Sequence, residues 1–217
     1  MNNLSSFDIL LLASGFFWTL TYIFIIKCGF QDKTYGMPLF ALSFNLSWEF
    51  IFSFIFPESH SHIQHIVDIV WLSFDVIILF QLFRYGIHNF PKLPTTIFYA
   101  VIGSAITAGF CSIFFIYSEI QDSGIYTAFG QNLLMSILFI TMLYQRQSLL
   151  GQSIWVGIFK LLGTVFASLA FYLYPVPEIS GKTALLPFLY ISIFIYDSIY
   201  IGLIASKANF IFNSSNS

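Results

Sequence analysis

The sequence predicts an all-α integral membrane protein, a bundle of about seven transmembrane helices that forms one domain over residues 1–217. Composition is the first reason: 58% of the residues are hydrophobic, 8% are charged, and the mean hydropathy is +0.83. A soluble domain carries about 25% charged residues. The second reason is that apolar runs of about 20 residues, the length of a membrane-crossing helix, recur along the chain with short polar breaks.

Each apolar run is long enough to cross the bilayer as a helix. The predicted spans are Phe7 to Lys27, Met37 to Pro57, Gln64 to Gly86, Thr96 to Tyr117, Gly124 to Tyr144, Gln152 to Tyr174 and Ala184 to Ser206. Helix-breaking residues punctuate the connections between the runs. They are Pro57, Pro91 with Pro94, Gly124, Gly151, and Pro175 with Pro177.

The basic residues predict the orientation of the bundle. Those on one side of the membrane are Lys27, Lys33, Arg84, Lys92, Arg146 and Lys207. The other side has Lys182, and Lys160 lies within a span. Because lysine and arginine are retained in the cytoplasm, we expect a cytoplasmic C-terminus and an N-terminus that is extracytoplasmic or lumenal.

Ionisable residues within the spans are the strongest functional signal in the chain. Glu49, Asp68, Asp75 and Asp197 are acids in apolar runs, and Lys160 is the basic residue in such a run. A charge at mid-bilayer costs a few kcal/mol even on lenient scales, so these side chains should face the bundle interior and mark a functional site.

Glu49 belongs to the segment from Asn45 to Glu49, in which Trp48 precedes the acid. Asn45 and Glu49 are four residues apart and therefore share a helix face. Because burial disfavours the charged form, we expect Glu49 to be protonated at neutral pH and able to act as an acid. The alternative is a neutral carboxyl that binds Asn45 and serves only helix packing.

Asp197 lies in the last predicted span, next to Tyr196. Helical spacing places Tyr190, Asp197 and Tyr200 on one face, so we expect the carboxyl to lie between two phenols. By helix rise it is about 20 Å from the outer end of its span, whereas Glu49 is about 12 Å from its own. The two acids can then hold opposite ends of an elongated substrate. The alternative is a structural aspartate bound by tyrosine.

The remaining polar residues within spans are less specific. Asp75 lies at mid-membrane, where it either orients a pocket or pairs with Lys160, and the lysine alternatively extends toward the cytoplasm. Asp68 lies nearer the interface, where we expect its charge to be solvated. Gln131 either lines a cavity or bonds a neighbouring helix.

Several other functions receive no support from the sequence. The net charge of -2 gives no sign of nucleic acid binding. We find no Asp-rich Mg²⁺ motif, P-loop, dinucleotide fingerprint or zinc-protease signature. His60, His62 and His65 cluster after the second span, but they lack a neighbouring cysteine, so we predict no metal site.

Several segments carry a resemblance to a known family. The run Thr34-Tyr35-Gly36-Met37, followed by Asn45-Leu46-Ser47-Trp48-Glu49 and Pro57, resembles the transmembrane terpene cyclases of fungal meroterpenoid and indole-diterpene pathways and their bacterial relatives. Gly151-Gln152-Ser153 and Lys160-Leu161-Leu162-Gly163-Thr164 are similar too, with lysine where the family commonly has arginine at position 160. Asp197, three residues before Tyr200, matches the second acidic position of the family.

The resemblance implies a membrane-bound terpene cyclase, an isomerase or lyase that needs no metal or organic cofactor. In the family, the residues that match Glu49 and Asp197 are implicated in proton-initiated cyclisation of a lipophilic, prenylated substrate, usually an epoxide. The buried aromatic rings then stabilise the carbocation. Residues expected to bind the substrate are Asn45, Trp48, Asp75, Gln131, Tyr190, Tyr196 and Tyr200.

Two other classes fit the intramembrane acids. A small proton-coupled transporter uses such acids, although it predicts broken helices and an internal repeat, for which we find little sign. An assembly subunit would use them only for helix packing. For the cyclase and for both alternatives, we expect a multi-pass protein of the bacterial inner membrane or the endoplasmic reticulum. The lipid bilayer is its expected surroundings, and the sequence identifies no protein partner.

Overall fold

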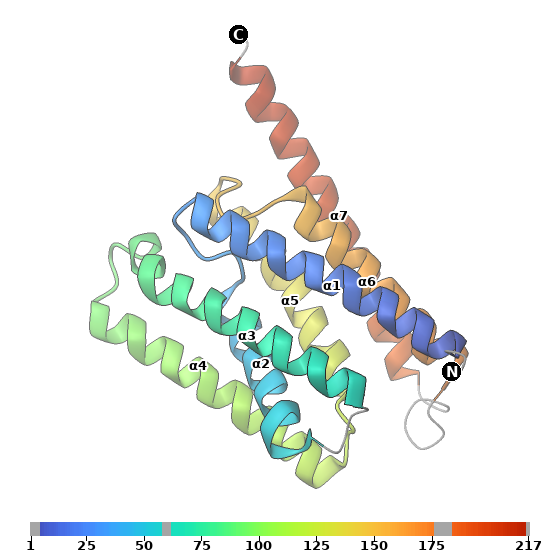
Figure 1. The fold of residues 1–217 in the computed structure, drawn as a ribbon. Helices are drawn as coiled ribbons and strands as arrows, with labels where there is room; N and C mark the ends of the chain where they lie inside the picture. The colour runs from blue at the N-terminus through green and yellow to red at the C-terminus, as the bar shows by residue number, and fades with distance from the viewer. Residues whose placement is uncertain (1–4, 58–61, 176–183, 216–217) are drawn as a thin grey trace.

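The computed structural model describes residues 5–57, 62–175 and 184–215, and this part of the chain is helical without a strand (Figure 1). The α-helices are α1 (Ser6–Gln31), α2 (Leu39–Phe50), α3 (His62–Tyr85), α4 (Thr95–Phe115), α5 (Ile125–Arg146), α6 (Ile154–Leu173) and α7 (Leu185–Ser215). Shorter segments are the π-helices η1 (Ile51–Ile55) and η4 (Ile116–Ile120) and the 3-10 helix η3 (Gly86–Asn89).

The predicted all-α membrane class is confirmed. Within the described residues, 6 helices are long and apolar enough to cross a membrane, and the helical stretch Leu39–Ile55 is a shorter apolar one. In the second predicted span, Met37 to Pro57, the α-helix begins two residues later than predicted and is followed by a π-helix from Ile51. The orientation stays a prediction, and Lys182 and His60 lie outside the described residues.

Helix α2 is the central element for the polar residues. It packs against α3, α4 and α5, whereas α1 lies against α6 and α3, and α7 lies against α5 and α6. The C-terminal part of α7 extends beyond the other helices (Figure 1). Because α2 has neighbours on several sides, Asn45, Trp48 and Glu49, which share one face of its last two turns, are buried, and so is Ser47 on another face.

The α1–α2 and α5–α6 loops bind each other at one end of the bundle. Arg146 donates to the Tyr35 carbonyl at 3.0 Å and lies 4.4 Å from the centre of the Tyr35 ring. The backbone N–H of Gly151 donates to Asp32 at 2.7 Å. Gly151 has φ of +71° and a Cβ there would lie 2.8 Å from the Tyr35 carbonyl oxygen, so glycine is required by both conformation and space.

The two π-helices contact each other at the opposite end of α2. The rings of Phe56 and Tyr117 stack with centroids 4.1 Å apart, and Phe52 meets the Tyr117 ring edge-on at 5.6 Å. Single-turn π segments are frequent at functional sites. One of these two begins two residues after Glu49.

Candidate functional site

Four polar side chains from α1, α2 and α3 form what we call the carboxyl cluster: Tyr22, Asn45, Glu49 and Asp75. The amide of Asn45 donates to Asp75 Oδ2 at 2.7 Å and also bonds the hydroxyl of Tyr22. All four are buried, with exposed fractions of 7% or less. Three helices therefore converge on one amide group.

Glu49 is the member of the carboxyl cluster that the amide does not bind. Its side chain is 2% exposed, and its Oε2 atom has no hydrogen-bond partner among the described residues. It lies close enough to Asp75 and Asp68 for electrostatic interaction with both carboxyls. A buried carboxyl without a cation beside it is strongly destabilised in its charged form. The site therefore favours a protonated Glu49.

The expectation for Asp68 was wrong. We expected a solvated charge near the interface, but Asp68 has an exposed fraction of 0% and accepts a hydrogen bond of 2.7 Å from Gln64. The two residues are four apart on α3, so the helix itself supplies the partner. Asp68 is thus part of the buried polar interior.

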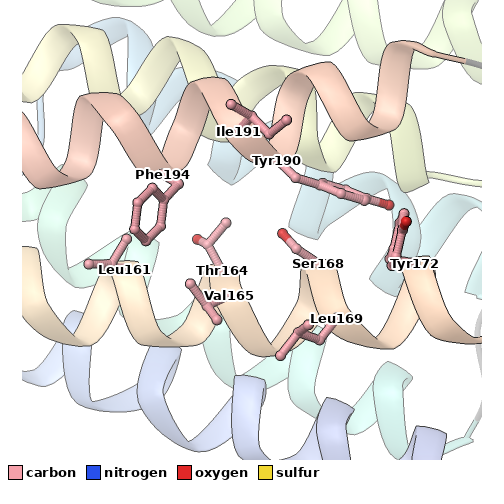
Figure 2. A pocket seen from close by; sticks show the side chains of 9 residues that line it. All are labelled: Leu161, Thr164, Val165, Ser168, Leu169, Tyr172, Tyr190, Ile191 and Phe194. Atoms are coloured by element: carbon pink, nitrogen blue, oxygen red, sulfur yellow. The ribbon is translucent and has the colours of Figure 1, made fainter.

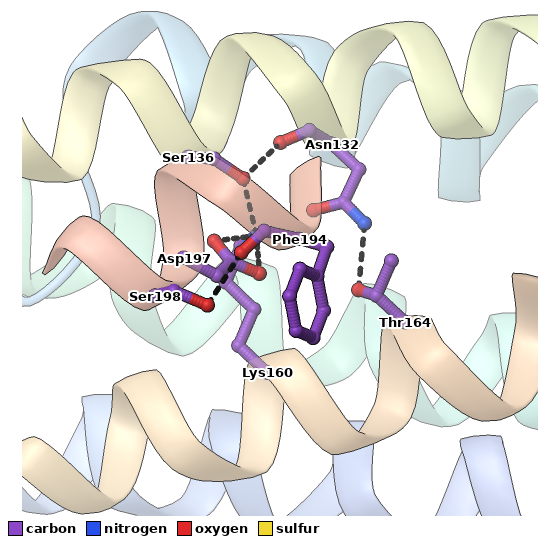
Figure 3. Close-up of polar contacts among 7 residues, drawn as sticks. All are labelled: Asn132, Ser136, Lys160, Thr164, Phe194, Asp197 and Ser198. Carbon is purple, nitrogen blue, oxygen red and sulfur yellow. Dashed lines mark hydrogen bonds and ion pairs between the residues drawn. The ribbon is translucent and has the colours of Figure 1, made fainter. Parts of the chain in front are cut away.

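Asp197 lies in a second group, which we call the ion-pair cluster: Ser136 on α5, Lys160 on α6 and Asp197 on α7 (Figure 3). The ammonium of Lys160 donates to the two carboxylate oxygens of Asp197 at 2.8 and 3.0 Å and to Ser136 Oγ at 2.7 Å. Lysine pairs with Asp197 and not with Asp75, and it does not extend to the surface.

The phenols expected beside Asp197 have other neighbours. Tyr200 is buried and donates to Gln152 at 3.2 Å, and the Tyr190 ring packs edge-on against Phe129, with centroids 4.6 Å apart. Tyr196 is 36% exposed on the outer face of α7. The spacing argument identified one face of the helix, but it could not show that a lysine from α6 would reach the carboxyl first.

Trp48 and Gln131 lie at a pocket of about 240 Å³ between α2, α4 and α5. Gln131 lines it, and its buried Oε1 atom has no hydrogen-bond partner among the described residues. The indole of Trp48 donates to the carbonyl of Gly124 at 3.2 Å and to Thr127, another lining residue, at 3.3 Å. The pocket therefore adjoins the residue next to Glu49.

A second pocket, of about 260 Å³, lies between α6 and α7 (Figure 2). Tyr190 extends from α7 toward Tyr172 of α6, above the hydroxyl of Ser168. The Tyr190 hydroxyl is buried and has no hydrogen-bond partner among the described residues. Thr164, which also lines the pocket, follows Lys160 by one helical turn. The pocket therefore adjoins the ion-pair cluster.

Aromatic rings connect the two polar clusters. The Lys160 ammonium lies 5.7 Å from the centre of the Trp18 ring. The rings of Trp18 and Trp71 have centroids 6.4 Å apart, and Trp71 lies 6.0 Å from Tyr22, which belongs to the carboxyl cluster. Trp71 is anchored by its N–H, which donates to Thr19 at 3.2 Å.

The two acids predicted to act on one substrate belong to different clusters. Glu49 and Asp197 are both buried, in different clusters, and neither lines either of the two pockets. Sequence reasoning missed Trp18 and Tyr22, because a single aromatic residue in an apolar run looks like a lipid-facing one. The four-residue spacing of Trp18 and Tyr22 was the available signal.

Comparison with known proteins places the chain in a family. The model of the Pyr4-like transmembrane terpene cyclases matches residues 3–201. The chain is 29% identical over 171 residues to the Pyr4-family terpene cyclase mfmH of Annulohypoxylon moriforme, which covers 76% of this chain and 69% of that protein. It is 26% identical over 166 residues to the terpene cyclase macJ of Penicillium terrestre, covering 73% and 64%.

A shorter match reaches the terpene cyclase pyr4 of Aspergillus fumigatus. It is 30% identical over 87 residues, or 40% of this chain and 36% of that protein. The chain thus spans between about a third and two thirds of the length of these three relatives. No solved structure matches the chain significantly.

Proposed function

The chain belongs to the Pyr4-like transmembrane terpene cyclases, and from this premise we propose that it is a membrane-bound cyclase that starts the reaction by protonating its substrate. The substrate is a lipophilic, prenylated molecule that carries an epoxide or a terminal alkene. The reaction uses neither a metal nor an organic cofactor. The product is an isomer of the substrate.

The observation that carries this proposal is the environment of Glu49. Its carboxyl is 2% exposed, has an oxygen without a partner among the described residues, and lies near two other carboxyls. Those neighbours and the apolar surroundings favour the protonated acid, which is the form that donates a proton at neutral pH. We assign Glu49 as the proton donor and Asp197 as the second catalytic acid residue.

The chemistry follows from one proton transfer. The O–H bond of Glu49 breaks as its proton binds the epoxide oxygen, and the adjacent carbon–oxygen bond breaks to leave a carbocation. An alkene of the prenyl chain supplies its electron pair to that carbon and forms the ring bond, which moves the positive charge along the chain. Loss of a proton from carbon to a base then forms the final double bond.

The aromatic rings between the clusters suit a migrating positive charge. The rings of Trp18, Trp71 and Tyr22 form a series of contacts that runs from the ammonium group bound to Asp197 to the carboxyl cluster. A ring face attracts a cation by about 2 kcal/mol or more in a desolvated site. Closed apolar walls also keep water from quenching the cation.

The two pockets are the proposed approaches of the substrate from the lipid. Each is smaller than the 300 to 1,000 Å³ of typical ligand pockets, so each holds part of a prenylated molecule. Gln131 in one and Tyr190 in the other present buried polar atoms that have no partner within the described part of the chain, and these atoms suit the oxygen-bearing parts of the substrate. Because Glu49 is buried, side chains near Trp48 must move to admit the reacting group.

The test is cyclisation by membranes that contain the protein. Membranes are incubated with epoxidised prenyl derivatives of aromatic or polyketide-derived compounds, and the extract is searched by chromatography and mass spectrometry for an isomer of unchanged mass. A related cyclase that accepts the same compound is the positive control. Recovery of unreacted substrate where the control cyclises it, or its transport into sealed vesicles without chemical change, would refute the proposal.

A further inference from the structure

Lys160 makes three short contacts that use all the protons of its ammonium group. Two run to the carboxylate oxygens of Asp197, at 2.8 and 3.0 Å, and one to Ser136 at 2.7 Å (Figure 3). The side chains of the pair are 1% and 2% exposed. An ammonium has three donors and no acceptor, so the group is fully satisfied by these partners.

The neighbours of Lys160 hold it in this position. The ring of Trp18 lies over the ammonium, 5.7 Å from its centre. Ser136 is fixed in turn, because its hydroxyl donates to the carbonyl of Asn132 at 2.9 Å. The lysine therefore binds Asp197 from one direction, and its aliphatic stem is packed within the bundle. These contacts fix the orientation of the Asp197 carboxylate, and the ammonium of Lys160 compensates its charge.

Glu49 has the opposite surroundings. The charged groups that act on it are the acids Asp68 and Asp75, and one of its oxygens has no partner among the described residues. A buried carboxylate is stable only when it is paired and hydrogen-bonded. Asp197 meets that condition and Glu49 does not. The two acids are therefore not equivalent.

We propose that Lys160 is a positioning residue that keeps Asp197 ionised and oriented, so that Glu49 alone supplies the starting proton and Asp197 presents negative charge to the carbocation. This inference rests on the proposed cyclase function and extends it to a division of roles. A carboxylate aimed where positive charge develops stabilises the transition state, and a fixed orientation avoids reorganisation during the reaction. Lys160 acts through Asp197 and does not itself touch the substrate.

The kinetic test compares three variants with the unmodified protein. Lys160→Arg keeps the charge and should retain turnover within about tenfold, since arginine also binds carboxylates with two donors. Lys160→Met should lower kcat by about 100-fold or more, the range typical of a lost electrostatic contact in an active site, with a small change in KM. The double variant Lys160→Met/Asp197→Asn should fold like the unmodified protein and remain inactive.

Matched controls separate this role from a purely structural ion pair. Lys27→Met removes the charge of an exposed lysine on α1 and should leave kcat unchanged. If Lys160→Met alone fails to fold, the double variant carries the test, because it removes both charges and leaves no unpaired one. A double variant with near-normal kcat would overturn the proposal, since neither charge would then be needed.

A spectroscopic readout makes the inference testable apart from activity. Isotope-edited infrared spectra report the carbonyl stretch of a protonated carboxyl. Lys160→Met should gain such a band for Asp197, and both the unmodified protein and the double variant should lack it. Identical carboxyl spectra for the unmodified protein and Lys160→Met would overturn the inference and leave the cyclase proposal standing. A protein that shows the expected bands and cyclises no substrate that a related cyclase accepts would refute the cyclase function, and the catalytic role of Lys160 with it.

Discussion

The side-chain amide of Asn45 on α2 donates a hydrogen bond of 2.7 Å to Asp75 on α3. Asn45 lies one helical turn before the buried Glu49. The same nitrogen bonds the hydroxyl of Tyr22 on α1. One amide therefore ties three helices together beside the proposed proton donor. Because Oδ1 of Asp75 has no hydrogen-bond partner among the described residues, this carboxyl depends on the bond that Asn45 donates to Oδ2.

Asn45→Ala should therefore destabilise the protein by about 1–3 kcal/mol, the cost of leaving a buried polar group unpaired. Thermal unfolding in detergent measures the change. A double-mutant cycle with Asp75→Ala provides the control, with an expected coupling energy of about 0.5–2 kcal/mol between the two positions. Additive losses would show that the hydrogen bond contributes nothing.

Glu49→Gln should lower turnover by about 100-fold or more, the usual contribution of a general acid. Glutamine has nearly the same size and no charge, so the fold and the unfolding temperature should change little. Glu119→Gln, at an exposed carboxyl on η4, is the matched control and should retain full turnover. Retained turnover in Glu49→Gln, measured with a substrate that the unmodified protein cyclises, would remove Glu49 from its assigned role.

Gly163→Ala should displace Trp18 from the ion-pair cluster. A Cβ at Gly163 would lie 2.6 Å from the Trp18 ring, so the indole must shift. Overpacking of this kind costs about 1–3 kcal/mol, and the ring would no longer cap the ammonium of Lys160. We expect a lower unfolding temperature and a changed ratio of cyclised products.

Gly202→Ala on α7 is the control for that experiment, because a Cβ at this position meets nothing within 4 Å. It should leave the unfolding temperature and the product ratio unchanged. If Gly163→Ala gives the product ratio of the unmodified protein, Trp18 does not contact the reacting chain.

Gly151→Ala should weaken the contact between the α1–α2 and α5–α6 loops. The left-handed backbone at φ +71° costs about 1–2 kcal/mol for a residue with a Cβ. The added atom would also lie 2.7 Å from Thr34 and 2.8 Å from Arg146. Thermal unfolding should show the loss, whereas Gly103→Ala, where a Cβ meets nothing within 4 Å, should not reduce stability. Equal effects of the two substitutions would contradict this account of the loop.

Gln131→Leu should raise KM about fivefold for an oxygen-bearing substrate, because one hydrogen bond to the ligand is worth roughly 1 kcal/mol. Stability should stay the same or rise, since the substitution removes a buried oxygen for which the described residues supply no partner. Thr141→Val, on the exposed face of the same helix, is the control. An unchanged KM would place the substrate outside this pocket.

The sequence predicted the bounds of a helix well where the apolar composition of the run alone decides them. The sixth predicted span, Gln152 to Tyr174, agrees closely with α6 at Ile154–Leu173. The second span, by contrast, changes from α-helix to π-helix at Ile51. Hydropathy cannot reveal such a change, because it alters the hydrogen-bond register of the backbone and leaves the apolar character of the run intact.

The partners of the buried charges were the least predictable feature. Asp68 finds its partner Gln64 on its own helix, yet we expected water there. The sequence left two alternatives for Lys160, a pair with Asp75 or a path toward the cytoplasm, and only the packing of α6 against α7, with Ser136 of α5 within reach, selects Asp197 and Ser136. Helical spacing shows on which face of its own helix a residue lies. It does not show how the neighbouring helix is turned about its axis.

The sequence by itself determined that this protein is a bundle of membrane-spanning helices, because lipid leaves the backbone of a long apolar run no other way to satisfy its polar groups. It also determined that Glu49 and Asp197 lie inside, because a charge in lipid is too costly. Only the tertiary structure decided that one acid stands among other acids and the other is bound to lysine. That difference depends on which helices are neighbours and how each is turned about its axis.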